Sequence, residues 1–105
     1  MKVVERRIFK IHPGKMDQVK GLEDRFWALE SQFGFPPKRR YECIAGPHDS
    51  ETYIFERDWD SFTVAEAAIQ KAFADPRLQA LLEEGTAVFG ATQMEFYSLL
   101  GPYAS

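Results

Sequence analysis

The first third of the chain changes from the periodicity of a strand to that of a helix. Residues 2–11 are rich in β-branched and aromatic types and stop at the turn signal His12-Pro13-Gly14, which predicts a strand. Apolar residues then recur every three or four positions, which predicts a helix of about five turns with one buried face. This apolar stripe consists of Met16, Val19, Leu22, Phe26, Leu29 and Phe33. Gly34 and the Pro36-Pro37 pair are expected to end the helix.

A hairpin is predicted to follow this helix. Residues 38–45 and 51–58 are rich in residues that favour strands, and residues 46–50 form a cluster of turn formers between them. Two shorter helices come next. The first has its apolar stripe at Phe62, Ala65, Ile69, Ala72 and Phe73, and the second at Leu78, Leu81 and Leu82.

The ends of these two helices carry clear signals. Asp60 or Ser61 can cap the first of them, and Asp75-Pro76 begins the second, which should end near Gly85 or Gly90. A last strand is expected over residues 91–100, followed by a loose tail over 101–105. The resulting order, β-α-β-β-α-α-β, is the split βαβ pattern of a ferredoxin-like α+β fold with an antiparallel four-stranded sheet.

Length and composition fit one globular domain over residues 1–105. The chain is 45% hydrophobic and 28% charged, which excludes a disordered chain, and its net charge of −3 gives no field that attracts nucleic acid or an anionic membrane. A single cysteine, Cys43, cannot form an internal disulfide, and we expect it to be a small core residue of the second strand. Residues 1–15 do not resemble a signal peptide, and no apolar run reaches the roughly 20 residues of a membrane span. We therefore expect a cytoplasmic protein.

Apolar side chains fall on both faces of the predicted sheet. Val4 and Ile8 point away from Val3, Phe9 and Ile11 because successive side chains of a strand alternate in direction. The same alternation separates Ile54 from Tyr53 and Phe55, and separates Met94 and Phe96 from Tyr97 and Leu99. The helices can cover only one face, and soluble monomers rarely expose a large apolar patch. A second copy of the same sheet is the simplest cover, so we expect a homodimer.

Charged residues within these strands are the first candidates for a functional site. Glu5 and Arg7 share a face with Phe9, Arg57 shares one with Tyr53 and Phe55, and Glu95 shares one with Tyr97. Charges in a half-buried sheet need partners. One explanation is a ladder of Glu5, Arg7, Arg57 and Glu95 that pairs across strands at a dimer interface. The other is a polar patch in a pocket, where an arginine anchors a carboxylate or an enolate oxygen. In both cases an aromatic wall is expected from Tyr41, Tyr53, Trp59 and Tyr97.

Several short motifs give the chain a family resemblance. Glu5-x-Arg7-x-Phe9 followed by Pro13-Gly14-Lys15, the stretch from Phe55 to Phe62, the stretch from Ala67 to Leu82 with Asp75-Pro76, and the ending Ser98-Leu99-Leu100 occur in a characteristic order. In this order the chain resembles the NIPSNAP-like branch of the dimeric α/β-barrel superfamily, the antibiotic-biosynthesis-monooxygenase-like proteins. The resemblance implies a homodimer with facing sheets and, in each subunit, a pocket between sheet and helices. It does not supply catalytic residues, because members of the superfamily differ in activity and this branch is mostly uncharacterised.

Other chemistries find little support in the sequence. Haem-degrading relatives carry an Asn on the first strand, a helical Trp and a nearby His, whereas this chain has Arg7 on that strand and no His between Pro76 and Leu82. His12 and His48 lie in predicted turns, without the well-spaced acidic partners that a metal site needs, so no metal and no cofactor are expected. The run Lys38-Arg39-Arg40 is expected to be a solvated start of a strand, and the acidic chain lacks the aromatic motif of an RNA-binding sheet.

Two functional hypotheses follow. The first is a homodimer that binds a small molecule, as a cofactor-independent monooxygenase or isomerase acting on a hydrophobic, acidic substrate. The alternative is a non-catalytic dimerisation or interaction module, which would have no enclosed polar pocket. The sequence leaves open whether the chain is an enzyme and which ligand it binds.

Overall fold

A four-stranded antiparallel sheet lies against a layer of three helices in the computed structural model, which describes residues 2–101. The elements are β1 (Val3–Ile11), α1 (Val19–Glu30), β2 (Arg39–Glu42), β3 (Thr52–Trp59), α2 (Phe62–Phe73), α3 (Pro76–Gly85) and β4 (Phe89–Ser98). Two 3-10 turns, Met16–Gln18 and Ser31–Phe33, extend α1 at its two ends. The strands are ordered β2-β3-β1-β4, so the predicted α+β split βαβ arrangement is confirmed. Of the predicted loose tail, only Gly101 lies within the described residues.

The helices begin and end where local signals place them. Gly34 takes the left-handed conformation (φ 78°) that favours glycine and ends the first helical segment. Ser61, not Asp60, caps α2, because its hydroxyl accepts a hydrogen bond from the backbone N–H of Val64. Asp75 caps α3, and Pro76 occupies the first turn as expected. Within residues 2–101 no helix has the length and apolar character that crossing a membrane would take.

The hairpin is shorter on one side than its sequence pattern predicts. The strand β2 pairs with β3 only over Arg39–Glu42, and all its residues are exposed because it is an edge strand. Cys43 therefore follows the strand and is half-buried, with its thiol near the backbone oxygens of Ala45 and His48. The expectation that Cys43 is a core residue of this strand is wrong, because the turn-rich segment after it leaves no layer to pack on it.

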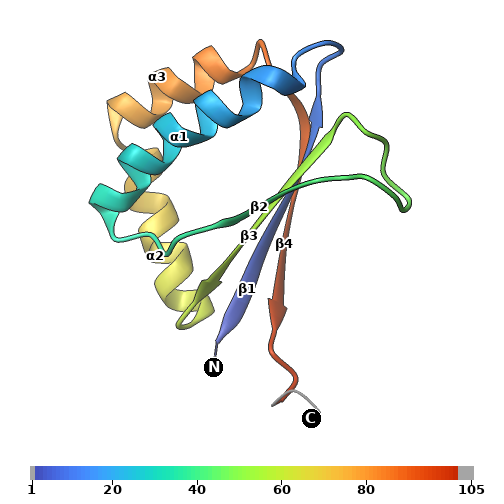
Figure 1. The fold of residues 1–105 in the computed structure, drawn as a ribbon. Helices are drawn as coiled ribbons and strands as arrows, with labels where there is room; N and C mark the ends of the chain where they lie inside the picture. Colours follow the sequence, from blue (N-terminus) through green and yellow to red (C-terminus); the bar gives the residue numbers. More distant parts are fainter. Residues whose placement is uncertain (1, 102–105) are drawn as a thin grey trace.

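The two faces of the sheet have different surroundings. Figure 1 shows all three helices on one side of the sheet. The core lies between these layers and includes Ile11, Val19, Leu22, Phe26, Tyr53, Phe55, Leu78 and Leu81. The opposite side, which we call the open face, has no helix against it. Its central residues Ile8 and Ile54 face each other across β1 and β3 and are half-buried.

The cap of α2 gives the first testable prediction. Replacing Ser61 with Ala removes the acceptor for the Val64 N–H and should lower the free energy of unfolding by about 1 kcal/mol, measured by urea denaturation. Asp60→Ala is the matched control and should leave stability unchanged. A larger loss in Asp60→Ala than in Ser61→Ala would show that the cap is assigned to the wrong residue.

Candidate functional site

A pocket of about 310 Å³ lies between the sheet and the helix layer. Its walls are mostly aromatic and aliphatic, with Phe9, Phe26, Phe35, Phe55, Phe89 and Leu78 among them. The lining residues Phe73, Leu82, Thr86 and Thr92 are exposed and mark its mouth, on the side of β4. The volume is at the lower end of the range of small-molecule sites, and mainly apolar walls with a few polar groups are typical of them.

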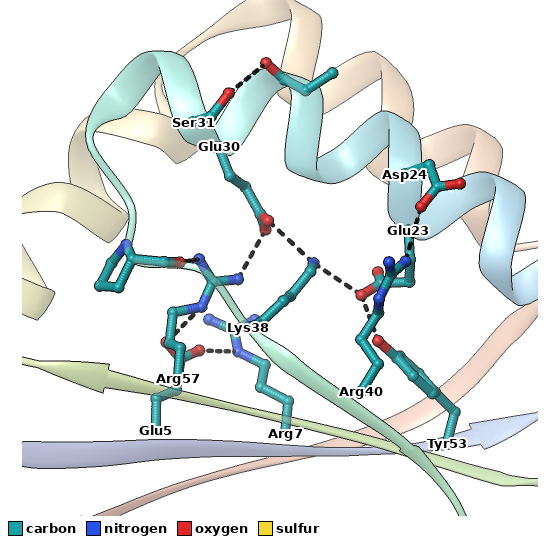
Figure 2. A network of polar contacts seen from close by, with 12 residues as sticks. Glu5, Arg7, Glu23, Asp24, Glu30, Ser31, Lys38, Arg40, Tyr53 and Arg57 are labelled. Atoms are coloured by element: carbon teal, nitrogen blue, oxygen red, sulfur yellow. Dashed lines mark hydrogen bonds and ion pairs between the residues drawn. The ribbon is translucent and has the colours of Figure 1, made fainter.

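The floor of this pocket is a set of six buried or nearly buried charges, which we call the ion network. It consists of Glu5, Glu23 and Glu30 with Arg7, Lys38 and Arg57, and these residues come from β1, α1, β3 and the segment before β2. Figure 2 shows the acidic side chains of α1 pointing down toward the basic side chains above the sheet. The three negative and three positive side chains balance, which lowers the cost of removing them from water.

Glu5 lies at the centre of the sheet and is only 1% exposed. Its Oε2 accepts a hydrogen bond of 2.6 Å from Nε of Arg7, and its Oε1 accepts one of 2.9 Å from the indole N–H of Trp59. Nε of Arg57 lies 3.6 Å from the same Oε1, which is an ion contact but too long for a hydrogen bond. Both carboxylate oxygens therefore have a direct donor, as a buried carboxylate requires.

Arg57 joins this carboxylate to the first helix. Its Nη2 lies 3.1 Å from Oε2 of Glu30, and its Nη1 donates to the backbone oxygen of Pro36 at 3.4 Å. The guanidinium also packs against the rings of Phe35 and Phe55, each 4.9 Å from its central carbon. Such stacking is favourable for a desolvated arginine.

Lys38 bridges the two acids of α1. Its Nζ lies 2.8 Å from Oε2 of Glu23 and 3.0 Å from Oε1 of Glu30, and its side chain is 3% exposed. The Tyr53 hydroxyl donates to the same oxygen of Glu23 at 2.6 Å. Burial raises the pKa of Tyr53 well above its ordinary value, and the negative charge of Glu23 raises it further, so the phenol keeps its proton.

Arg7 differs from the other two cations. Its Nε binds Glu5, but within residues 2–101 its two terminal nitrogens have no hydrogen-bond or ion-pair partner. The side chain is 18% exposed, lines the pocket and lies over the ring of Phe55, 5.9 Å from its centre. A guanidinium fixed at one nitrogen and free at its forked end is suited to hold a carboxylate or an enolate oxygen.

The structure divides the candidate residues between the two faces. Glu5, Arg7, Tyr53, Arg57 and Trp59 lie on the helix side, and all but Tyr53 and Trp59 line the pocket. Tyr41, Glu95 and Tyr97 lie on the open face. The ladder that joins Glu95 to Glu5, Arg7 and Arg57 is therefore wrong. Glu95 stands opposite Arg6, one residue out of phase with Arg7. The single wall of four aromatic residues is wrong for the same reason.

Three members of the ion network were missed by the sequence reasoning. The side chain of Lys38 is buried, which contradicts the expectation that the basic run is solvated. The other two residues of the run are exposed as expected: Arg39 pairs with Asp58, and Arg40 pairs with Asp24. A signal for its partners is present in the sequence, because Glu23 and Glu30 are spaced as members of the apolar stripe with Val19 and Phe26. Acids at such buried positions require a cation, and the position of Lys38 just after α1 allows it to supply one.

The histidines lie outside the pocket lining. His12 is exposed and its Nε2 is 3.1 Å from the backbone oxygen of Thr86, while His48 lies in the exposed β2–β3 connection. In the described part of the chain no three His, Cys, Asp or Glu side chains are grouped to hold a metal ion.

The network predicts a large loss of stability when its lysine is removed. Lys38→Met leaves Glu23 and Glu30 without the cation between them and should lower the free energy of unfolding by about 3–5 kcal/mol in urea denaturation. Arg40→Met, two residues later on the exposed edge, is the matched control and should have a much smaller effect. Equal losses for the two variants would contradict the buried position of Lys38.

Comparison with known proteins supports the fold. No protein-family model and no curated protein sequence matches the chain. A NIPSNAP family protein from Agrobacterium tumefaciens has a similar structure, with a TM-score of 0.78 at 20% identity over 91% of this chain and 83% of that one. A NIPSNAP domain protein from Burkholderia xenovorans gives a TM-score of 0.79 at 19% identity, over 96% of this chain and 99% of that one.

A protein of described activity has the same architecture. SnoaB from Streptomyces nogalater, a cofactor-independent oxygenase, matches with a TM-score of 0.66 at 14% identity, over 99% of this chain and 98% of that one. At such identities the likeness concerns the fold alone. The resemblance noted in the sequence is thus confirmed at the level of structure: the chain has the α+β fold of NIPSNAP family proteins and of SnoaB.

Proposed function

We propose that the chain binds a small, hydrophobic and acidic molecule in the pocket between sheet and helices. The observation that carries this proposal is the free forked end of Arg7 at a cavity of about 310 Å³ with aromatic walls. The walls favour a flat apolar body, and the guanidinium favours a carboxylate or an ionised phenol or enol at its edge. Because Lys38 and Arg57 are each paired with acids of α1, Arg7 is the cation that a ligand anion would meet.

The same geometry favours chemistry that passes through an oxyanion. Arg7 can stabilise an enolate that forms when the carbon next to a substrate carbonyl gives its proton to a base such as water, or a phenolate that forms when a substrate hydroxyl does so. In an isomerase that proton returns to another carbon. In a cofactor-independent monooxygenase the carbanion gives two electrons to O₂ and forms a C–O bond. Protonation then gives a hydroperoxide, and loss of water leaves a carbonyl where a CH₂ group was. The likeness to SnoaB, a cofactor-independent oxygenase, supports the second reaction by analogy of fold.

The alternative is a dimerisation or interaction module without a reaction. That hypothesis expects no enclosed polar pocket, and a cavity of this volume with a charged floor counts against it. Oxygen uptake in the presence of a metal chelator supports the monooxygenase, and formation of an isomeric product in the absence of oxygen supports the isomerase.

We also propose that two copies of the chain associate through the open face. Val4, Ile8 and Ile54 supply apolar surface there, and Tyr41 and Tyr97 are each almost half exposed. The charges beside them are largely paired within the chain, as in the 2.9 Å contact between Nε of Arg6 and Glu56. A face of this composition can pack on a second copy of itself without leaving unpaired charges.

The ligand proposal predicts that binding depends on Arg7. In calorimetric titrations with 2-naphthoate, Arg7→Ala should weaken binding by roughly tenfold to a hundredfold, the usual worth of hydrogen bonds to charged groups. Arg25→Ala is the matched control, because Arg25 pairs with Glu84 on the outside of the helix layer, and it should bind normally. The proposal fails if folded Arg7→Ala binds 2-naphthoate as well as the unaltered chain does.

The association proposal predicts a mass of two chains in native mass spectrometry. Ile8→Glu places a charge in the centre of the open face and should shift the protein to one chain with its fold intact. Val64→Glu, the same change on the exposed side of α2, should leave the mass at two chains. A single-chain mass for the unaltered protein at micromolar concentration would contradict the proposal.

A further inference from the structure

Three buried polar atoms at the floor of the pocket lack a well-formed hydrogen bond. They are Nζ of Lys38, Oε1 of Glu30 and Nε of Arg57. Nζ of Lys38 forms ion pairs with Glu23 at 2.8 Å and with Glu30 at 3.0 Å, yet neither contact has the alignment of a hydrogen bond. All three residues line the pocket. A buried charged group left in this state costs free energy, which a suitable partner in the pocket would recover.

The charge balance of the ion network restricts that partner. Around Lys38, the carboxylates of Glu23 and Glu30 already balance Lys38 and Arg57. An anion at the floor would face the carboxylates of Glu23 and Glu30, and a cation would face Lys38 and Arg57, in each case as an excess buried charge. A neutral group avoids both penalties. It must also accept a hydrogen bond from Lys38 and donate one to Glu30, which a hydroxyl group does.

We propose that the floor between Lys38 and Glu30 is a second subsite, which binds a hydroxyl group of the ligand. This inference rests on the proposed function and extends it, since it assigns the other end of the ligand. The hydroxyl oxygen accepts from Nζ of Lys38 and its proton goes to Oε1 of Glu30. The ligand class is then a hydroxyaryl acid, with its acidic group at Arg7 and its hydroxyl at Lys38 and Glu30.

The ring of Phe55 lies beside both subsites. Nζ of Lys38 lies 4.6 Å from the centre of this ring and Cζ of Arg7 lies 5.9 Å from it. We therefore choose as the probe a fused two-ring aromatic with substituents at opposite ends. Figure 2 shows Arg7 rising from β1 and Lys38 reaching from the segment before β2 toward the acids of α1.

The test compares 2-naphthoate with 6-hydroxy-2-naphthoate, which differ only by a hydroxyl at the far end. The unaltered protein should bind the hydroxylated acid about tenfold more tightly in calorimetry, which corresponds to about 1.4 kcal/mol. The ether 6-methoxy-2-naphthoate can accept from Lys38 but cannot donate to Glu30. It should therefore bind more weakly than the hydroxylated acid. This part of the test needs no variant and does not depend on how a substitution folds.

A double variant removes the cation of the subsite and keeps the charges balanced. Lys38→Met with Glu23→Gln removes one cation and one anion, and Tyr53 can still donate to the new amide oxygen. In this variant only Glu30 remains to bind the hydroxyl, so the tenfold preference should fall to about threefold or less, while Arg7→Ala should weaken both acids and leave their tenfold ratio unchanged.

The outcomes separate the two proposals. If both acids bind through Arg7 with equal affinity in the unaltered protein, the hydroxyl subsite is wrong and the proposed function stands; this is also the result expected if a water molecule alone satisfies the floor. A tenfold preference that persists in a folded double variant places the hydroxyl elsewhere and overturns the subsite. If neither acid binds, the proposed function itself is wrong.

Discussion

The carboxylate of Glu5 is buried in the middle of the sheet, and its need for donors organises the layer above it. Arg7 and Trp59 donate to it from the two central strands, and Arg57 links it to Glu30 on α1. Lys38 then closes the series between Glu30 and Glu23. The ion network therefore connects the sheet to α1 and to the segment before β2. An unpaired charge at any of these positions would be costly, so each side chain is held by the others.

The ion network also accounts for the polar floor of the pocket beneath the helices. Well-packed apolar residues of similar volume can replace a buried ion network at little cost in stability, so the charges are not needed to fold the domain. They keep polar atoms at the floor of an otherwise apolar space. They also hold Nε of Arg7 at 2.6 Å from Glu5 while its other nitrogens are free. In the proposed site, Arg7 is thus oriented before any ligand arrives, which reduces the entropy lost on binding.

Two adjacent arginines show how different the two faces of the sheet are. Arg6 points to the open face and pairs with Glu56, whereas Arg7 points to the helices and lines the pocket. The period of two in a strand was enough to predict that Glu5, Arg7 and Phe9 share a face, and the order of elements followed from the apolar stripes and the caps. The same alternation predicts that Glu95 and Tyr97 share a face, but it does not say which residues of different strands meet.

The missed features depend on register and on the path of loops. Whether Glu95 meets Arg6 or Arg7 is a difference of one residue in the pairing of β1 with β4, and no local signal determines it. Lys38 follows the Pro36-Pro37 pair, and the direction of its side chain depends on how that segment crosses the end of α1. Cys43 was misplaced because the strand ends before the turn formers begin. The acids at buried spacings in α1 were the available clue to the pocket floor.

The central claim is that Arg7 presents its free nitrogens to a ligand anion in a pocket whose floor is already balanced in charge. A crystal structure of the protein with 2-naphthoate tests it most directly. The account predicts that the carboxylate lies within hydrogen-bond distance of the terminal nitrogens of Arg7, with the Nε contact to Glu5 retained and the rings among Phe9, Phe55 and Phe89. A naphthoate bound on the open face, or an Arg7 whose terminal nitrogens are taken by a side chain of a partner subunit, would contradict it.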